Sequence, residues 1–112
     1  MKAALAARRA LAGAIAGVEQ QMAQHALLES RPPSDEALAS RQPFCVDTLR
    51  FPQWVQFVFL PGLRERLEAG DAMPEYCDVA PMAEEYLKME NPGGQPLVDA
   101  LEELDRLVTA ST

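Results

Sequence analysis

The sequence predicts an all-α fold, a single-domain four-helix bundle with a proline-kinked central helix. Apolar residues recur at spacings of three and four, the period of a helix with one buried face. Alanine dominates the first third of the chain and β-branched residues are sparse, which favours helix over strand. The chain has 112 residues, enough for one hydrophobic core but too few for two, so we expect one domain over residues 1–112.

The first helix is expected over residues 3–29. Its inner face consists of apolar residues at spacings of four, three and four, namely Leu11, Ile15, Val18 and Met22, with Ala4 and Ala7 extending the face backward. A second stripe holds only small residues, Ala6, Ala10, Gly13 and Gly17. Glycine costs about 1 kcal/mol relative to alanine inside a helix. The stripe therefore either receives another helix closely, from this bundle or from a second copy in a symmetric dimer, or is simply tolerated.

Proline and serine residues end this helix. The segment Ser30–Ser34 contains two prolines, which cannot continue a helix, and its serines compete for backbone hydrogen bonds. We expect a loop from here to about Pro43, with at most one helical turn at residues 35–39.

The central helix is expected over residues 53–69. Pro52 suits its first turn, and Gly70 suits the position just past its end. Pro61 removes one hydrogen bond and clashes with the carbonyl four residues earlier, so a kink is expected at residues 57–61. The apolar stripe shifts there, from one face before the kink to a nearly opposite face after it: Trp54, Val55 and Val58, then Leu60, Leu63 and Leu67.

Two further helices are expected after an extended strap at residues 71–80. The strap is anchored by apolar side chains, Met73, Pro74, Tyr76 and Val79. Pro81 opens a short helix that ends at Asn91–Gly94, with an inner face of Met82, Ala83, Tyr86 and Leu87. Pro96 starts the last helix, whose apolar seam is Leu97, Leu101, Leu104 and Val108. Acidic residues flank this seam as a solvated face: Asp99, Glu102, Glu103 and Asp105.

Charge is unevenly distributed along the chain. Residues 1–60 carry six Lys or Arg against five Asp or Glu, whereas residues 61–112 carry four against twelve. Nucleic-acid affinity comes largely from Lys and Arg that displace counterions from phosphates, so direct nucleic-acid binding is disfavoured. An acidic half suits a basic protein partner, such as an enzyme that handles RNA, or serves solubility alone.

The start of the chain and its cysteines predict a cytoplasmic protein. Cys45 and Cys77 stand far apart, without other metal-type ligands nearby, so we expect reduced thiols rather than a disulfide or a zinc site. Arg8 and Arg9 interrupt the apolar start of the chain, and no stretch approaches about 18 consecutive apolar residues. We therefore expect neither a signal peptide nor a membrane span.

No catalytic, cofactor or metal site is expected. The single histidine, His25, is better explained as a helix-end residue than as the base of a cysteine nucleophile. The acidic pairs Glu84–Glu85 and Glu102–Glu103 lack the Glu-x-x-His partners of a di-metal bundle. Gly93–Gly94 lacks the surrounding pattern of a phosphate loop. The residues favour a non-enzymatic protein.

Residues 42–61 hold all four phenylalanines and the only tryptophan. Clustered aromatics mark either the core or a binding surface. We expect Asp47 or Thr48 to accept backbone amide bonds where the chain enters the next helix, with Phe44 packed beneath. The polar and aromatic side chains of this segment form a candidate interaction surface: Gln42, Phe44, Asp47, Thr48, Trp54 and Gln56.

This segment resembles the YqcC-like family of small uncharacterised bacterial proteins. The resemblance is carried by Gln42-Pro43-Phe44, Asp47-Thr48, Trp54, Phe57, Pro61, Pro74 and Val79-Ala80-Pro81, and it covers about residues 10–108. Compared with that family, Phe57 stands in place of a tryptophan, Pro52 is unusually placed and the loop at residues 30–40 is longer.

The resemblance implies a compact four-helix bundle and a cytoplasmic protein with no established enzymatic activity. Members of that family are often encoded beside a tRNA pseudouridine synthase. The resemblance thus implies an accessory role in tRNA modification, with the synthase as the basic partner. An alternative hypothesis is a small-ligand-binding protein or minor enzyme that uses a pocket near the Pro61 kink, with Gln56 or Asp47 as polar contacts. A third is direct RNA binding through four arginines: Arg8, Arg9, Arg41 and Arg50.

Overall fold

The computed structural model describes residues 2–74, 77–90 and 94–110, and the regular structure within them is entirely helical. In chain order the elements are α1 (Lys2–Gln24), α2 (Asp35–Leu38), η1 (Pro43–Cys45), α3 (Phe51–Trp54), η2 (Val55–Phe59), α4 (Leu60–Ala69), α5 (Ala80–Glu90) and α6 (Gln95–Ala110). The predicted all-α bundle is confirmed. Tyr76, predicted to anchor the strap, lies outside the described residues. So do residues 91–93, which were predicted to end the helix that begins near Pro81. None of the described helices has the length and apolar character needed to cross a membrane.

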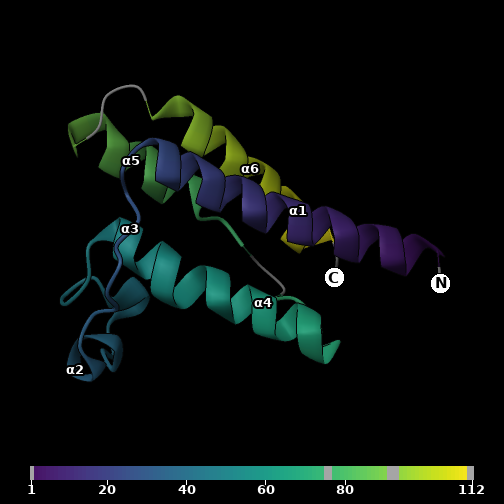
Figure 1. Cartoon of the computed structure of the whole chain (residues 1–112), viewed down its shortest axis with the longest axis horizontal. Coiled ribbons are helices and arrows are strands. Elements are labelled where there is room, and N and C mark those ends of the chain that lie inside the picture. The colour runs from purple at the N-terminus through teal and green to yellow at the C-terminus, as the bar shows by residue number, and fades with distance from the viewer. Residues whose placement is uncertain (1, 75–76, 91–93, 111–112) are drawn as a thin grey trace.

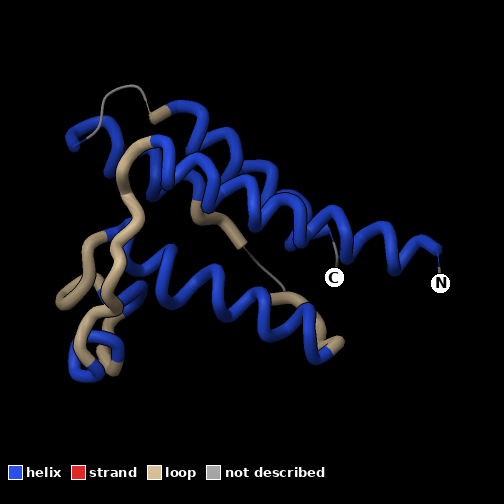
Figure 2. Tube along the Cα trace, viewed as in Figure 1, coloured by secondary structure: helices blue, strands red, loops and turns tan. Residues whose placement is uncertain are grey.

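The longest helix, α1, lies antiparallel beside α6, and this pair forms the most extensive helix–helix contact (Figure 1). The continuous segment from α3 to α4 contacts α1, while α5 packs on α6. Outside the helices, residues 71–74 follow the end of α4, and residues 77–79 lead into the start of α5 (Figure 2). The loop that contains α2 lies at one end of the bundle, so the predicted interaction segment is at that end too.

The predicted apolar faces of the first and last helices form most of the core. Four residues on each helix are buried: Leu11, Ile15, Val18 and Met22 on α1, and Leu97, Leu101, Leu104 and Val108 on α6. The predicted extension of the first face is wrong at Ala7, which is exposed, and the side chain of Ala4 lies outside the described residues. Fully burying one such side chain stabilises the fold by about 1.5–3 kcal/mol relative to leaving it exposed. The seam between α1 and α6 is therefore the main source of stability.

The first helix ends at Gln24, five residues before the predicted end. Ala26 has a φ of 57°, in the left-handed region. The amide of Leu27 donates to the carbonyl of Met22 at 2.8 Å, and the amide of Ala26 donates to that of Ala23 at 3.1 Å. These two bonds are the pattern of a Schellman motif, which usually places glycine where Ala26 stands. The motif turns the chain toward the loop before the prolines are reached.

The stripe of small residues on α1 faces away from the bundle. Ala6, Ala10 and Gly13 are exposed. A Cβ built on Gly13 or Gly17 would meet nothing within 4 Å. The close helix approach that would explain these glycines is therefore not made within this bundle.

Pro61 lies inside a continuous helical segment, because a π-helical turn precedes it. Val55–Phe59 winds as a π turn, and the amide of Leu60 donates to the carbonyl of Val55, five residues earlier. Proline has no amide to donate and crowds the carbonyl four residues back, so the wider turn accommodates it. The predicted interruption of the α-helix is present in this form.

The prediction that the apolar stripe changes face at Pro61 is wrong. On a regular α-helix, positions five residues apart differ by about 140°. Val55 and Leu60 are nevertheless each only 1% exposed, and they share one core with Leu63. Trp54 and Leu67 pack against the same core. The extra residue of the π turn thus brings Trp54 and Val55 onto the same side as the three leucines. Val58 is only partly buried and is not part of this core.

Candidate functional site

Five aromatic side chains gather where α3 and η2 meet the preceding loop and α5. Trp54 stacks on Phe59 with ring centroids 5.1 Å apart, and Phe44 meets Trp54 edge-on at 5.0 Å. Phe51 lies 6.4 Å from Trp54 and 6.0 Å from Tyr86. Offset and edge-to-face pairs at such distances add to the stabilisation from burial. The cluster is thus a continuous layer from the core to the surface.

Trp54 contacts both the hydrophobic core and the exposed part of this layer. It is half-buried and packs against the hydrophobic core, while one of its partners, Phe44, is 45% exposed. A tryptophan in this position supports the exposed ring from beneath. Phe44, rather than Trp54, is the aromatic residue of the candidate surface that reaches solvent most fully.

The loop around Phe44 presents apolar side chains on a strained backbone. Phe44 and Cys45 have φ values of 57° and 52°, and Val46 is 70% exposed. Each non-glycine residue in the left-handed region costs about 1–2 kcal/mol. The turn is held by the Gln42 carbonyl, which accepts from the Cys45 amide at 3.0 Å. It is also held by the buried Cys45 itself, whose carbonyl accepts from Leu49 at 2.8 Å. The exposed pair is therefore fixed in place.

The prediction that Asp47 or Thr48 caps the next helix is wrong. The Thr48 hydroxyl donates to the carbonyl of Ala37 at 2.7 Å, and the Asp47 carboxylate accepts from the Ser40 hydroxyl. Both side chains thus tie the loop to the α2 turn. At the start of α3 the Gln53 side-chain oxygen accepts from the Arg50 amide at 2.8 Å instead.

Gln56 binds backbone rather than facing solvent. Its amide oxygen accepts from the Glu29 amide at 2.9 Å, and its amide nitrogen donates to the Glu29 carbonyl at 2.9 Å. This pair of bonds joins the end of the α1 loop to η2. Gln42 is exposed beside Phe44. Of the six predicted surface residues, Phe44 and Trp54 are in contact, while Gln56 contacts a different segment.

His25 and two of the four arginines considered for RNA binding make local contacts. The His25 ring nitrogen Nδ1 lies 2.8 Å from the carbonyl of Gln21, which confirms the helix-end interpretation. Arg8 donates to the carbonyl of Leu67 at the end of α4, and Arg50 pairs with Glu29 at 3.0 Å. These contacts give both arginines a structural explanation.

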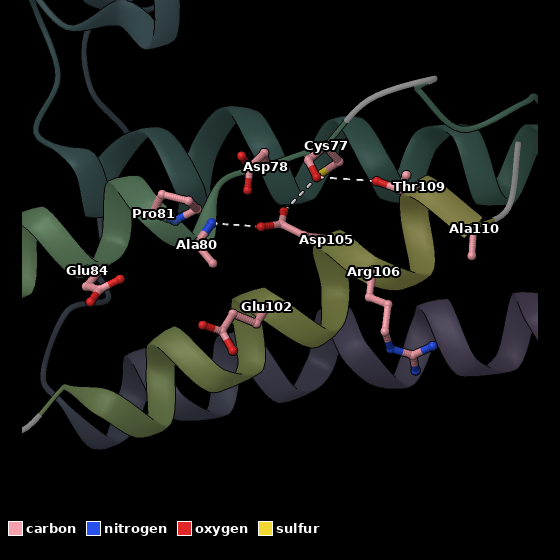
Figure 3. A pocket seen from close by; sticks show the side chains of 10 residues that line it. All are labelled: Cys77, Asp78, Ala80, Pro81, Glu84, Glu102, Asp105, Arg106, Thr109 and Ala110. Atoms are coloured by element: carbon pink, nitrogen blue, oxygen red, sulfur yellow. Dashed lines mark hydrogen bonds between the residues drawn. The ribbon is translucent and has the colours of Figure 1, made fainter.

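A groove of about 640 Å³ lies between the first turn of α5 and the C-terminal half of α6 (Figure 3). Cys77, Ala80 and Asp105 form its buried floor, and Glu84 and Glu102 are exposed at its rim, one from each helix. The alternative hypothesis placed a pocket near Pro61, whereas this groove is lined by the strap and the last two helices.

Asp105 caps the N-terminus of α5 from the neighbouring helix. It is 7% exposed, and its Oδ2 accepts from the amides of Val79 and Ala80, each at 2.8 Å. Its Oδ1 accepts from the Cys77 thiol at 3.0 Å. The first amides of a helix need external acceptors, and Val79, at the capping position, has no side-chain oxygen. Asp105 therefore supplies the missing cap.

The prediction that Asp105 belongs to a solvated face is wrong. It lies four residues after Leu101 and three before Val108, on the buried seam. That spacing was the available sign that it points inward. Burial, together with the hydrogen bond and negative charge of Asp105, raises the pKa of the Cys77 thiol. Cys77 thus remains a protonated donor and a weak nucleophile.

Comparison with known proteins identifies the family. A family model described as DUF446, tRNA pseudouridine synthase C, matches residues 10–107. The chain belongs to this family. An uncharacterised protein of Haemophilus influenzae is 42% identical over 74% of this chain and 80% of its own length. The uncharacterised protein YqcC of Escherichia coli is 29% identical over 80% of this chain and 83% of its own length. The YqcC-like resemblance is confirmed.

Two further comparisons connect the family to a fold and to a longer protein. The solution NMR structure of Escherichia coli YqcC has a TM-score of 0.83 at 24% identity, covering 95% of this chain and 91% of that one. The two family members therefore share one fold. A protein of Pectobacterium carotovorum named tRNA pseudouridine synthase C is 33% identical over 54% of this chain, but over only 17% of its own length.

Proposed function

We propose that this protein is a non-catalytic accessory protein that binds a tRNA pseudouridine synthase in the cytoplasm. The observation that carries the proposal is the match to a short segment of a protein named tRNA pseudouridine synthase C. A segment similar to about half of this chain, 54%, thus stands in one polypeptide with a much longer region. Two units in one chain meet at a high effective concentration, whereas the same two units as separate chains need an interface.

The Phe44–Val46 surface, which we define as the exposed side chains of Gln42, Phe44 and Val46, is the contact that we propose. Fixed aromatic anchors contribute most to binding because little conformational entropy is lost when they are covered. Phe44 is such an anchor, since Trp54 supports its ring and the turn holds its backbone. The acidic second half of the chain also suits an enzyme that binds an anionic RNA through basic residues.

The experiment is a binding titration between two purified proteins, this chain and the tRNA pseudouridine synthase C of the same organism. Isothermal calorimetry with and without tRNA should give a stoichiometric complex. Phe44→Ala and Val46→Asp should each weaken it at least about tenfold, as expected for anchor positions. Both side chains are exposed, so both variants should keep the helical circular dichroism and cooperative melting of the wild type.

A matched control is Leu5→Ala, which removes an exposed apolar side chain, 51% accessible, from another surface. This variant should bind as the wild type does. A wild-type protein that binds no synthase, with or without tRNA, contradicts the proposed function. Binding that survives both loop substitutions contradicts only the assignment of the surface.

A further inference from the structure

We propose that the groove between α5 and α6 is a docking site for a basic, partly apolar peptide segment of another protein. In this proposal lysine or arginine side chains of the segment pair with the acidic rim, and an apolar side chain rests on the floor. The groove shares no residue with the Phe44–Val46 surface, and the inference does not depend on the proposed function.

The floor of the groove offers apolar contact. Ala80 and Cys77 are 3% and 9% exposed, and the methyl-bearing residues Thr109 and Ala110 continue the lining along α6. The one carboxylate in the floor, Asp105, already accepts three hydrogen bonds from the protein. A polar ligand group would gain little there, whereas an apolar side chain would be removed from water.

The rim of the groove is acidic on both sides. Glu84 on α5 and Glu102 on α6 are exposed on either side of it (Figure 3). Within the described residues neither glutamate takes part in an ion pair. Arg106, the basic residue of the lining, is paired with Glu103 outside the groove through two hydrogen bonds. The rim therefore retains carboxylates for a basic partner.

The helix end in the groove does not reverse this preference. The first turn of a helix carries partial positive charge and by itself attracts anions. In this groove Asp105 already occupies that position, with the amides of Val79 and Ala80 on its Oδ2. The helix end is thus neutralised from within the protein, and the exposed glutamates determine the sign of the occupant.

The size of the groove favours a peptide over a single ion. Its volume of about 640 Å³ is many times the roughly 30 Å³ that one water occupies, and several side chains fit into it. The surplus of acidic residues in the second half of the chain would also speed the approach of a basic segment.

The test is an NMR titration of the ¹⁵N-labelled full chain with a short peptide of repeated Leu-Lys-Lys units. Shifts should concentrate on the amides of Ala80, Glu84, Glu102 and Ala110. The double variant Glu84→Gln and Glu102→Gln should bind about threefold to tenfold more weakly, as expected for the loss of two exposed ion pairs. Ala110→Trp, which fills the groove from an exposed position, should abolish these shifts.

The matched control is the double variant Glu65→Gln and Glu68→Gln, which removes the same charge from the exposed face of α4. This variant should change the affinity less than twofold.

Equal weakening in both double variants, or shifts centred on α4, would show general charge attraction and overturn the proposal. If an all-lysine peptide binds as tightly, the apolar side chain adds no affinity, and the proposed apolar contact with the floor is wrong. Mg²⁺ alone shifting the same amides and displacing the peptide would assign the groove to a cation instead. A repeated Leu-Glu-Glu peptide should not bind.

Discussion

The carboxylate of Asp105 accepts a hydrogen bond from the backbone amide of Ala80 at 2.8 Å, and so caps a helix to which it does not belong. Most N-caps are local side chains, placed next to the amides that they satisfy. Here the acceptor comes from α6, which makes the start of α5 dependent on how the two helices pack. The same carboxylate also fixes the Cys77 thiol.

Replacement of Asp105 should therefore destabilise the protein strongly. Asp105→Ala leaves two amides and a thiol without their acceptor in a buried site, at a cost of about 2–5 kcal/mol. Urea denaturation followed by circular dichroism measures the loss. Asp99→Ala, at an exposed position of the same helix, should change the free energy of unfolding by less than about 0.5 kcal/mol. If Asp105→Ala lowers the free energy of unfolding as little as Asp99→Ala does, the cap contributes little to stability.

Stability should fall in alkaline solution because of Cys77. Its pKa is raised in the folded protein from an ordinary value of 9.0, so above that pH the unfolded chain releases a proton that the folded chain retains. The contribution of the protonated Cys77 thiol to the free energy of unfolding is fully present below about pH 9. It is lost as the pH rises further, by at most about 1.4 kcal/mol per pH unit. Cys77→Ser, which keeps a donor for Asp105 without titrating, should flatten this slope between pH 8 and 11. Equal alkaline slopes in the two proteins would count against the assignment.

Gln56 should contribute to stability rather than to binding. Gln56→Ala removes both hydrogen bonds to the backbone of Glu29 and should lower the free energy of unfolding by about 1–3 kcal/mol. Gln56→Glu should also destabilise, because a carboxylate cannot donate to the Glu29 carbonyl. Thermal melts followed by circular dichroism measure both changes. Gln42→Ala, at an exposed position, serves as the control and should leave the melting temperature unchanged. A neutral Gln56→Ala would mean that water replaces these bonds without loss.

Trp54 and Phe44 should separate core from surface. Trp54→Ala opens the aromatic layer above the core and should destabilise the fold by about 2–4 kcal/mol, less than a fully buried tryptophan. Phe44→Ala should cost less than about 1 kcal/mol, since the ring is largely exposed. Differential scanning calorimetry compares the two. If Phe44→Ala is the more destabilising, the loop is part of the fold rather than a presented surface.

Ala26→Gly should stabilise the protein. Ala26 adopts a left-handed conformation that glycine enters without a steric penalty, and the gain should be about 0.5–1 kcal/mol. Ala23→Gly, within the last turn of α1, should instead destabilise by up to about 1 kcal/mol. Chemical denaturation of both variants provides the comparison. A loss of stability in Ala26→Gly would show that the alanine methyl group makes a contact that outweighs the strain.

The helices that were predicted well are those whose sequence carries both a long apolar period and proline or glycine at the ends. The seam of α6 after Pro96 and the start of α5 near Pro81 follow from this combination, whereas the seam of α1 follows from its apolar period alone. The end of α1 did not, because Ala26 stands where glycine would have marked the turn. Local sequence contains no sign that an alanine will be forced into the left-handed region by the packing around it.

The candidate site was harder to predict than the fold, since its geometry depends on distant partners. Phe44 and Trp54 were grouped correctly, because nearby aromatics tend to pack together. The partners of Thr48 and Gln56 are backbone groups in other segments, and spacing alone cannot identify them. Asp105 was missed because acidic residues on a helix are usually solvated, although its position in the seam pointed inward.

Because Val55–Phe59 forms a π turn, the number of residues in this turn determines which sides of α3 and α4 face the core, whatever side chains the turn carries. Deleting one residue there would restore ordinary winding and rotate Trp54 by about 100° relative to Leu63. The aromatic layer and the leucine side of the same helix would then no longer face a common core. A single-codon deletion in this turn would thus damage the molecule more than most substitutions, even if the deleted side chain had no partner of its own.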